Sequence, residues 1–186
     1  HQSGERLVSL GGYGIDEHGD YVTFSTLRVL DVAGVIGWVR GDRTQLADHI
    51  HFHEAPENAP PDFFTICGGV LIENGDEFWS CLGQNFQGGY VDLNACPSIG
   101  TTQVYTKSIR RFALDAFRPD APPVYLGETA SPPAWARRRD LNVLPAVVPG
   151  GDGAVALAGV FTLEEGIWTA PIVIDPQGEM SMGDPD

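Results

Sequence analysis

Glycine and proline divide this chain into short segments, and that division limits the fold more than any other feature of the sequence. The 186 residues include 23 glycines and 14 prolines, spread along most of the length. Between them lie apolar or alternating segments of strand length, bounded by residues that favour turns. The sequence therefore predicts an all-β fold, an antiparallel β-sandwich or barrel with one or two short helices.

We expect a single β domain over residues 1–175 and a polar C-terminal tail over 176–186. The predicted strands cover residues 6–10, 21–30, 32–40, 48–54, 88–93, 142–148, 154–163 and 167–174, with a hairpin over 63–83. Within 32–40, Gly34 and Gly37 indicate a bulge or a close approach by another part of the chain.

One segment has helical rather than strand periodicity. Its apolar side chains recur at i, i+3, i+4, i+7 and i+8, which predicts a helix that begins after Ser108 and ends before Pro119. These side chains are Ile109, Phe112, Ala113, Ala116 and Phe117. A second short helix is expected over 131–137, because proline is well suited to the first turn of a helix.

The hairpin determines how the cysteines can pair. Its turn contains Asn74-Gly75, a strong signal for a tight connection between two strands. A three-residue loop ending at Gly75 places Cys67 opposite Cys81 and permits a disulfide, whereas a two-residue turn at Asn74-Gly75 does not. A bridge between Cys81 and Cys96 is the competing pair, and three reduced thiols are the third alternative.

The charge balance limits the partners. The chain has 25 acidic and 11 basic residues, and its formal net charge is −14. Such a surface repels a phosphate backbone, so we expect no nucleic acid partner. We also expect no membrane span, because no apolar run approaches the length of about 20 residues that a spanning helix needs. The start at His1 rather than Met favours a processed, secreted or extracytoplasmic protein with a protein or small-molecule partner.

Three of the five histidines alternate within residues 48–54. Side chains on a strand alternate between its faces, so His49, His51 and His53 are expected on one face. Ile50 and Phe52 then lie on the other face, which we expect to be buried. The segment is therefore predicted to be a half-buried strand that presents three imidazoles together.

This arrangement indicates a transition-metal site. Histidines on one strand face are about 6.6–6.8 Å apart at the backbone, so two of them can bind one ion. A third ligand must come from elsewhere, and the candidates are Glu54, Glu57, Asp48, His1 and His18. The predicted site is His49, His51, His53, Glu54 and Glu57. Imidazole suits Zn, Cu, Fe and Ni, and we expect Zn or Cu; the alternative is a solvated, titrating face.

The histidine segment and the residues before it resemble two families of β-sandwich proteins. Residues 33–39 followed by 47–58 resemble the glycine-spaced strand and "AHIH…GENGP" run of chordin-type (CHRD) modules. His51-Phe52-His53-Glu54 is similar to the metal-binding strand of copper–zinc superoxide dismutases. Both resemblances are local, centred on Ala47–Glu54, and imply an extracytoplasmic Greek-key β-sandwich. A dismutase would need further histidines downstream, but none follows His53.

His51-x-His53 with Glu57 also resembles the first motif of cupins, although the histidine of the second motif is absent. The sequence therefore favours a secreted β-sandwich binding or structural module with a histidine-rich metal site. The first alternative is a metal-dependent enzyme, cupin-like or a copper oxidoreductase, with Glu54 or Glu57 as ligand or general base. The second is a small-molecule-binding β-barrel. An apolar pocket beside the histidines favours the enzyme, and a flat exposed face favours the module.

Two further groups of residues are weaker candidates. Residues 137–139 are three consecutive arginines, and with Arg110 and Arg111 they can either gather an anionic ligand or pair with the chain's own carboxylates. The tryptophans can line a sugar platform or pack in the core; they are Trp38, Trp79, Trp135 and Trp168.

Overall fold

The computed structural model describes residues 1–89, 100–162, 164 and 166–183. Within these residues the strands form three four-stranded sheets and two two-stranded ribbons. Every pair of named strands is antiparallel. The predicted all-β, antiparallel fold is therefore confirmed.

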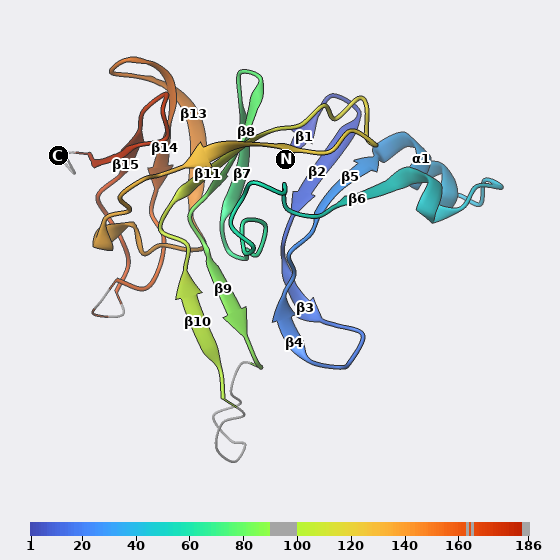
Figure 1. Cartoon of the computed structure of the whole chain (residues 1–186), viewed down its shortest axis with the longest axis horizontal. Helices are drawn as coiled ribbons and strands as arrows, with labels where there is room; N and C mark the ends of the chain where they lie inside the picture. The colour runs from blue at the N-terminus through green and yellow to red at the C-terminus, as the bar shows by residue number, and fades with distance from the viewer. Residues whose placement is uncertain (90–99, 163, 165, 184–186) are drawn as a thin grey trace.

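We name the three sheets by their position in the molecule (Figure 1). The first sheet has the order β1 (Gln2–Ser3), β2 (Arg6–Leu10), β5 (Leu27–Asp31) and β6 (Ile50–His53). The central sheet has the order β12 (Val124–Glu128), β11 (Ile109–Ala113), β8 (Glu77–Cys81) and β7 (Val70–Asn74). The third sheet has the order β13 (Asn142–Val148), β14 (Gly151–Leu157), β15 (Ile172–Ile174) and β16 (Met180–Met182).

Smaller elements complete the described chain. One ribbon pairs β3 (Tyr13–Ile15) with β4 (Tyr21–Thr23), and the other pairs β9 (Gln84–Gln87) with β10 (Thr102–Tyr105). The helical elements are α1 (Val32–Val39) and two 3₁₀ turns, η1 (Leu46–His49) and η2 (Ala134–Ala136). In Figure 1, α1 lies at the edge of the molecule beyond the first sheet.

The central sheet is buried on both faces. Neighbouring residues of a strand face opposite sides, and in β8 Phe78 packs in one core while Trp79 packs in another. The first core, between the first and central sheets, contains Val8, Leu27, Phe63, Phe64, Phe78, Phe112 and Ala116. The second core, between the central and third sheets, includes Trp79, Cys81, Ile109, Ala154, Ile172 and Ile174. The fold is therefore a β-sandwich of three layers, which follow one another across Figure 1.

Two apolar segments form the opposite secondary structure from the one predicted. The predicted helix over 108–117 is wrong, because residues Ile109–Ala113 form strand β11, which pairs with β8 on one edge and β12 on the other. The predicted strand over 32–40 is also wrong. Residues Val32–Val39 form α1 instead, and they add no strand beside β5, whose two edges are paired with β2 and β6.

The other elements agree with the prediction to different degrees. The strands over 6–10 and 142–148 are confirmed as β2 and β13. Residues 21–30 divide into β4 and β5, and the second helix is only the 3₁₀ turn η2. The strand predicted over 154–163 is shifted toward the N-terminus as β14, and the one predicted over 167–174 is shortened to β15. Residues 180–182, in the predicted polar tail, form β16 and pair with β15. Of the strand predicted over 88–93, residues 90–93 lie outside the described residues.

The predicted hairpin is confirmed over β7 and β8, but its turn matches neither of the two expected registers. Asn74 pairs with Glu77, so Gly75 and Asp76 form a two-residue turn, and Gly75 has the positive φ of 61° that the first turn position requires. Cys81 is consequently opposite Val70, whereas Cys67 forms an isolated bridge with Gln84.

This register separates the first predicted cysteine pair. Cys67 and Cys81 are both free thiols, so the disulfide between them is not formed. Burial raises the pKa of the Cys81 thiol far above its ordinary value, which makes this side chain a core residue and not a nucleophile. The competing pair involves Cys96, which lies outside the described residues.

Candidate functional site

The histidine segment is only partly a strand. β6 pairs with β5 in the register His51–Val29 and His53–Leu27, and both β5 residues are fully buried. Directly paired residues share a face, so His51 and His53 face the core side of the first sheet. Phe52 faces outward and is 62% exposed. The prediction that Phe52 lies on the buried face is therefore wrong, because the sheet buries the histidine side instead.

His49 belongs to η1, not to the strand, and it has a structural contact. Its Nδ1 atom lies 3.5 Å from Oδ2 of Asp31. Its ring packs on Gly34 of α1 so closely that a Cβ atom at this glycine would lie 2.0 Å from His49 Nδ1. The close approach predicted at Gly34 is confirmed, and His49 holds α1 against η1.

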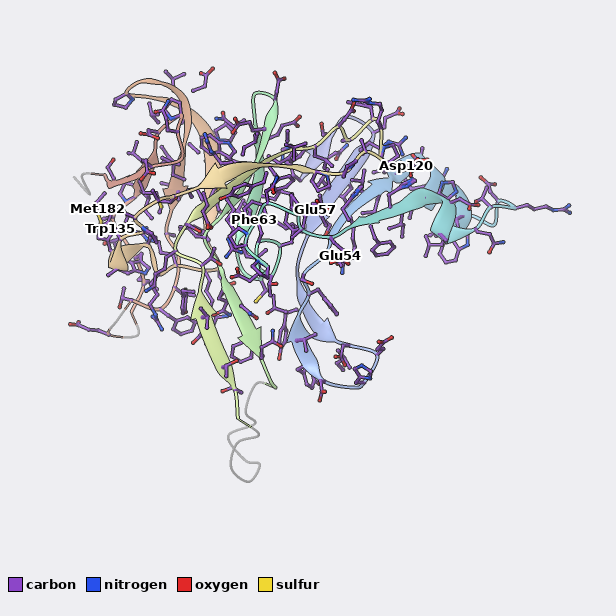
Figure 2. The ribbon with its side chains drawn as sticks, in the orientation of Figure 1. Glu54, Glu57, Phe63, Asp120, Trp135 and Met182 are labelled. Atoms are coloured by element: carbon purple, nitrogen blue, oxygen red, sulfur yellow. The ribbon has the colours of Figure 1, made fainter. Side chains whose placement is uncertain are left out.

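His51 is bound to a different part of the chain. Its Nδ1 atom lies 3.1 Å from Oδ1 of Asp120, whose side chain is 92% exposed. Asp120 belongs to the long connection from β11 to β12, so this contact fixes the connection to the first sheet. Figure 2 shows Asp120 toward α1, whereas Glu54 and Glu57 lie nearer the centre of the molecule.

His53, Glu54 and Glu57 line a common groove, which we name the β6 groove. Its volume is about 550 Å³, within the range of small-ligand sites. One wall is the end of β6 and the segment after it, and the other wall is the start of β12. These are edge strands of the first and central sheets, respectively. The lining residues are Phe52, His53, Glu54, Ala55, Pro56, Glu57, Asn58, Pro122, Pro123, Val124 and Tyr125.

The β6 groove combines apolar walls with carboxylates that have no partner. Proline, phenylalanine, tyrosine and valine supply most of its side chains. Glu54 and Glu57 are its acidic residues, both exposed, and neither forms a hydrogen bond or ion pair with a described residue. The Nε2 atom of His53 is buried and also has no hydrogen-bond partner among the described residues. The side chains of Glu54, Glu57 and His53 are therefore not paired within the described part of the protein.

A second hollow of about 620 Å³ shares Pro122 and Val124 with the β6 groove, and we name it the Asp115 hollow. Unlike the carboxylates of the β6 groove, most carboxylates of the Asp115 hollow are paired within the protein. Asp115 accepts a hydrogen bond from Nε of Arg118 at 2.6 Å. Glu73 accepts one from the Ser3 hydroxyl and lies 3.2 Å from His1 Nε2. The β6 groove is therefore the hollow with the more available charge.

The five predicted metal ligands are only partly brought together. His53, Glu54 and Glu57 share the groove, whereas His49 and His51 contact Asp31 and Asp120. Among the other candidates, His1 pairs with Glu73, His18 with Glu17, and Asp48 caps η1. In the described part of the chain, no group of three or more His, Cys, Asp or Glu residues is arranged to hold a metal ion. Metal binding stays a prediction.

Sequence reasoning missed the second wall of the groove. No strand is predicted between Pro119 and the helix expected over 131–137, but Val124–Glu128 is strand β12, and Pro122, Pro123 and Tyr125 line the groove. Pro122 and Pro123 directly precede β12, and proline is disfavoured in strands, so the local sequence does not favour a strand here. The alternation of Val124 and Leu126 with Tyr125 was the available signal, since Tyr125 packs against the first core.

The arginines are used within the protein. Each of the three consecutive arginines stacks on an aromatic ring: Arg137 on Tyr105 at 4.2 Å, Arg138 on Trp168 at 4.6 Å and Arg139 on Phe161 at 4.6 Å. Arg138 is fully buried and donates to the carbonyls of Ala158 and Ala170, and burial lowers its pKa to about 10. Arg110, Arg111 and Arg139 pair with carboxylates of the chain, as one of the two hypotheses predicted.

The comparisons with known proteins assign no family to this chain. A scan of the sequence against protein-family models finds no match, and a search among curated proteins finds none either. In the residues that the structure describes, no helix is both long enough and apolar enough to cross a membrane.

Proposed function

We propose that this chain is a binding module whose β6 groove holds a cationic ligand with an apolar body. The observation that carries the proposal is the unpaired state of Glu54 and Glu57 beside apolar walls. A protonated amine or a guanidinium satisfies such carboxylates through charge-assisted hydrogen bonds. A neutral ligand would leave the two carboxylates without an ion pair, and an anionic ligand would be repelled by them.

The remaining lining residues suit the apolar part of this ligand. Phe52 and Tyr125 line the two sides of the groove, and aromatic rings can attract cations as well as apolar groups. Arg28 lies 6.0 Å from the centre of the Phe52 ring, so one face of this ring is already used. His53 Nε2 is buried and has no partner among the described residues, so the imidazole ring contributes its carbon edge, and not this nitrogen, to the groove wall.

Tryptamine is a direct probe, because it joins an indole ring to an amine that is protonated at neutral pH. Indole-3-acetate is the matched ligand, with the same ring and the opposite charge. Titration calorimetry is expected to detect tryptamine with a Kd of about 1 mM or lower and to detect no binding of indole-3-acetate. Equal affinities for the two ligands would contradict the proposal.

A pair of double variants tests the two carboxylates. Glu54→Gln/Glu57→Gln is expected to weaken tryptamine binding about tenfold, since each exposed charge pair contributes up to about 1 kcal/mol. Glu5→Gln/Glu17→Gln is the control, because it removes the same charge from two exposed residues outside the groove. An equal loss in both double variants would reduce the effect to net charge and would remove the role of the groove.

The metal-dependent enzyme stays the second candidate, because the groove beside His53 is apolar. In that alternative, His53, Glu54 and Glu57 would have to move together to bind Zn or Cu, because they are not arranged to hold an ion in this structure. The metal would supply Lewis-acid or redox chemistry when bound. Titration of the purified protein with Zn²⁺ and Cu²⁺ separates the two candidates. Stoichiometric binding that is lost in His53→Ala but kept in His18→Ala would favour the metal site. Export from the cytoplasm also stays a prediction.

A further inference from the structure

The helix α1 leaves its apolar side chains outside the protein. All eight of its residues are apolar or glycine, and none is buried. Ile36, Trp38 and Val39 are 44%, 42% and 71% exposed. Ile36 and Val39, three residues apart, share one face of the helix, and Trp38 lies around its side. Together they leave the C-terminal end of the helix apolar and exposed, and an exposed apolar patch is typical of an interaction surface.

Contacts near both ends of the helix nevertheless hold it in place. His49 packs on Gly34, as described above. At the C-terminus, Gly41 donates to the Trp38 carbonyl and Asp42 donates to the Gly37 carbonyl, both at 3.0 Å. These two bonds form a Schellman motif around Gly41, whose φ is 96°. The exposed side chains are therefore held in a fixed place.

Two cations stand beside this patch. Of the 11 basic residues, Arg40, Arg43 and Lys107 are the three whose side chains form no hydrogen bond, ion pair or ring contact within the described chain. Lys107 is half-buried, whereas Arg40 and Arg43 are exposed and directly follow α1. The carboxylate of Asp42, between them, is turned toward the helix, where its Oδ2 would lie 2.5 Å from a Cβ atom at Gly37.

We name Ile36, Trp38, Val39, Arg40 and Arg43 the α1 tip. The tip is an apolar body with unpaired cations, and the β6 groove has apolar walls with unpaired carboxylates. We propose that the β6 groove receives the α1 tip of a second copy of this chain. The proposal rests on the function proposed for the groove and names its partner.

Position explains why the contact forms between copies. The α1 tip lies just before the segment formed by η1 and β6. The β6 groove begins at Phe52 and His53, the last residues of that segment, so the tip and the groove lie at its opposite ends. Figure 1 shows α1 directed away from the rest of the molecule. Each copy therefore offers one tip and one groove, and two copies that exchange tips form a closed dimer.

The expected affinity is modest. One short helix covers less area than a standard stable interface, so the Kd should lie in the range of roughly 10–1000 μM. The net charge of −14 also repels two copies at low salt. Association should therefore be measured at about 0.15 M salt. At this ionic strength the Debye length is about 8 Å, so repulsion between distant charges is screened more than the attraction between charges in contact.

Charge reversal provides a test that does not depend on the loss of an interaction alone. The tip variant is Arg40→Glu/Arg43→Glu, and the groove variant is Glu54→Arg/Glu57→Arg. Sedimentation velocity should show concentration-dependent association of the wild-type chain and monomers for each variant alone. An equimolar mixture of the two variants should associate again, because the reversed tip then meets the reversed groove. Glu5→Arg/Glu17→Arg is the control and should associate like the wild type.

A wild-type chain that stays monomeric up to about 1 mM, a variant that associates unchanged, or a mixture that stays monomeric would each overturn the proposal. All four substituted residues are exposed, and the recovery in the mixture shows that both variants are folded. Tryptamine separates this inference from the proposed function. Monomers that bind tryptamine would refute the dimer and retain the groove, whereas monomers that do not bind it would refute both.

Discussion

β11 and α1 are both short apolar segments, and they differ in what surrounds them. In β11, Ile109 and Phe112 are fully buried, one in the second core and one in the first. In α1, no residue is buried. β11 is held by neighbours on both faces and both edges, whereas α1 is held by a few local contacts. Since the two segments have similar apolar content but different burial, we expect β11 to contribute far more than α1 to the free energy of unfolding.

The largest expected effect is the truncation of Phe112. Its ring contacts those of Phe63, Phe64 and Phe78, with centroid distances of 6.3, 5.2 and 5.8 Å. Phe112→Ala should therefore lower the free energy of unfolding by about 3–5 kcal/mol. Urea unfolding followed by circular dichroism measures this change.

Trp38→Ala is the matched truncation in α1. Because the side chain is already 42% exposed, the expected loss is about 1 kcal/mol or less. Similar losses in Phe112→Ala and Trp38→Ala would break the comparison between the two segments, since they would mean that α1 carries as much packing energy as the first core.

An intermediate effect is expected at the glycines of α1. In Gly34→Ala the new methyl group meets the His49 ring, and relief of that contact should cost about 1–3 kcal/mol. In Gly37→Ala it meets only the flexible end of Asp42, so the gain in helix propensity of about 0.5–1 kcal/mol should prevail. Thermal unfolding of both variants measures the difference.

Removal of the His49 ring tests whether this ring causes the destabilisation expected for Gly34→Ala. The stability of Gly34→Ala/His49→Ala should equal or exceed that of His49→Ala alone, because the methyl group then meets no imidazole. If Gly34→Ala were just as destabilising in the absence of the ring, His49 would not be the side chain that holds α1 in place.

The smallest effect concerns the turn that ends β11. Asp115 accepts hydrogen bonds from the Nε of Arg118 and from the backbone of Phe117, and these interactions, with Arg118 first, lower the pKa of this carboxyl group. A pKa below the unfolded value stabilises the fold at higher pH, and this contribution is lost as the pH falls through the folded pKa. Arg118→Ala should raise the pKa of Asp115, measured by NMR titration.

Asp16 is the internal control for that titration. Its pKa is also lowered, mainly by the backbone amide of Asp20 in the turn between β3 and β4, so Arg118→Ala should leave it unchanged. A shift at Asp16, or none at Asp115, would show that the turn after β11 is not fixed by this side-chain pair.

The sequence predicted the fold class because turn residues and short apolar segments act locally. β2 and β13 were found where alternation and flanking turns agreed. β11 and α1 were exchanged because their apolar residues fit both periodicities, and the choice depends on strand partners far away in the sequence. The hairpin was found, but a turn shifted by one residue changed the partner of Cys81.

The site was predicted only where its residues are consecutive. His53, Glu54 and Glu57 lie on one wall of the groove, and the histidine pattern led to them. The sequence could not predict which face of β6 is buried, because the register with β5 determines it. The contacts of His49 with Gly34 and of His51 with Asp120, and the second wall of the groove, join residues that only the fold brings together.

The central claim is that the β6 groove binds a cationic, apolar ligand, and NMR mapping of a tryptamine titration tests it most directly. In correlation spectra, the backbone amides of His53, Ala55, Asn58 and Tyr125 should shift along one saturable curve, while those of β14 stay in place. Indole-3-acetate should leave all of them unchanged. Saturable shifts confined to Phe117 and Ala121 of the Asp115 hollow, or no saturable shift in the groove, would contradict the account.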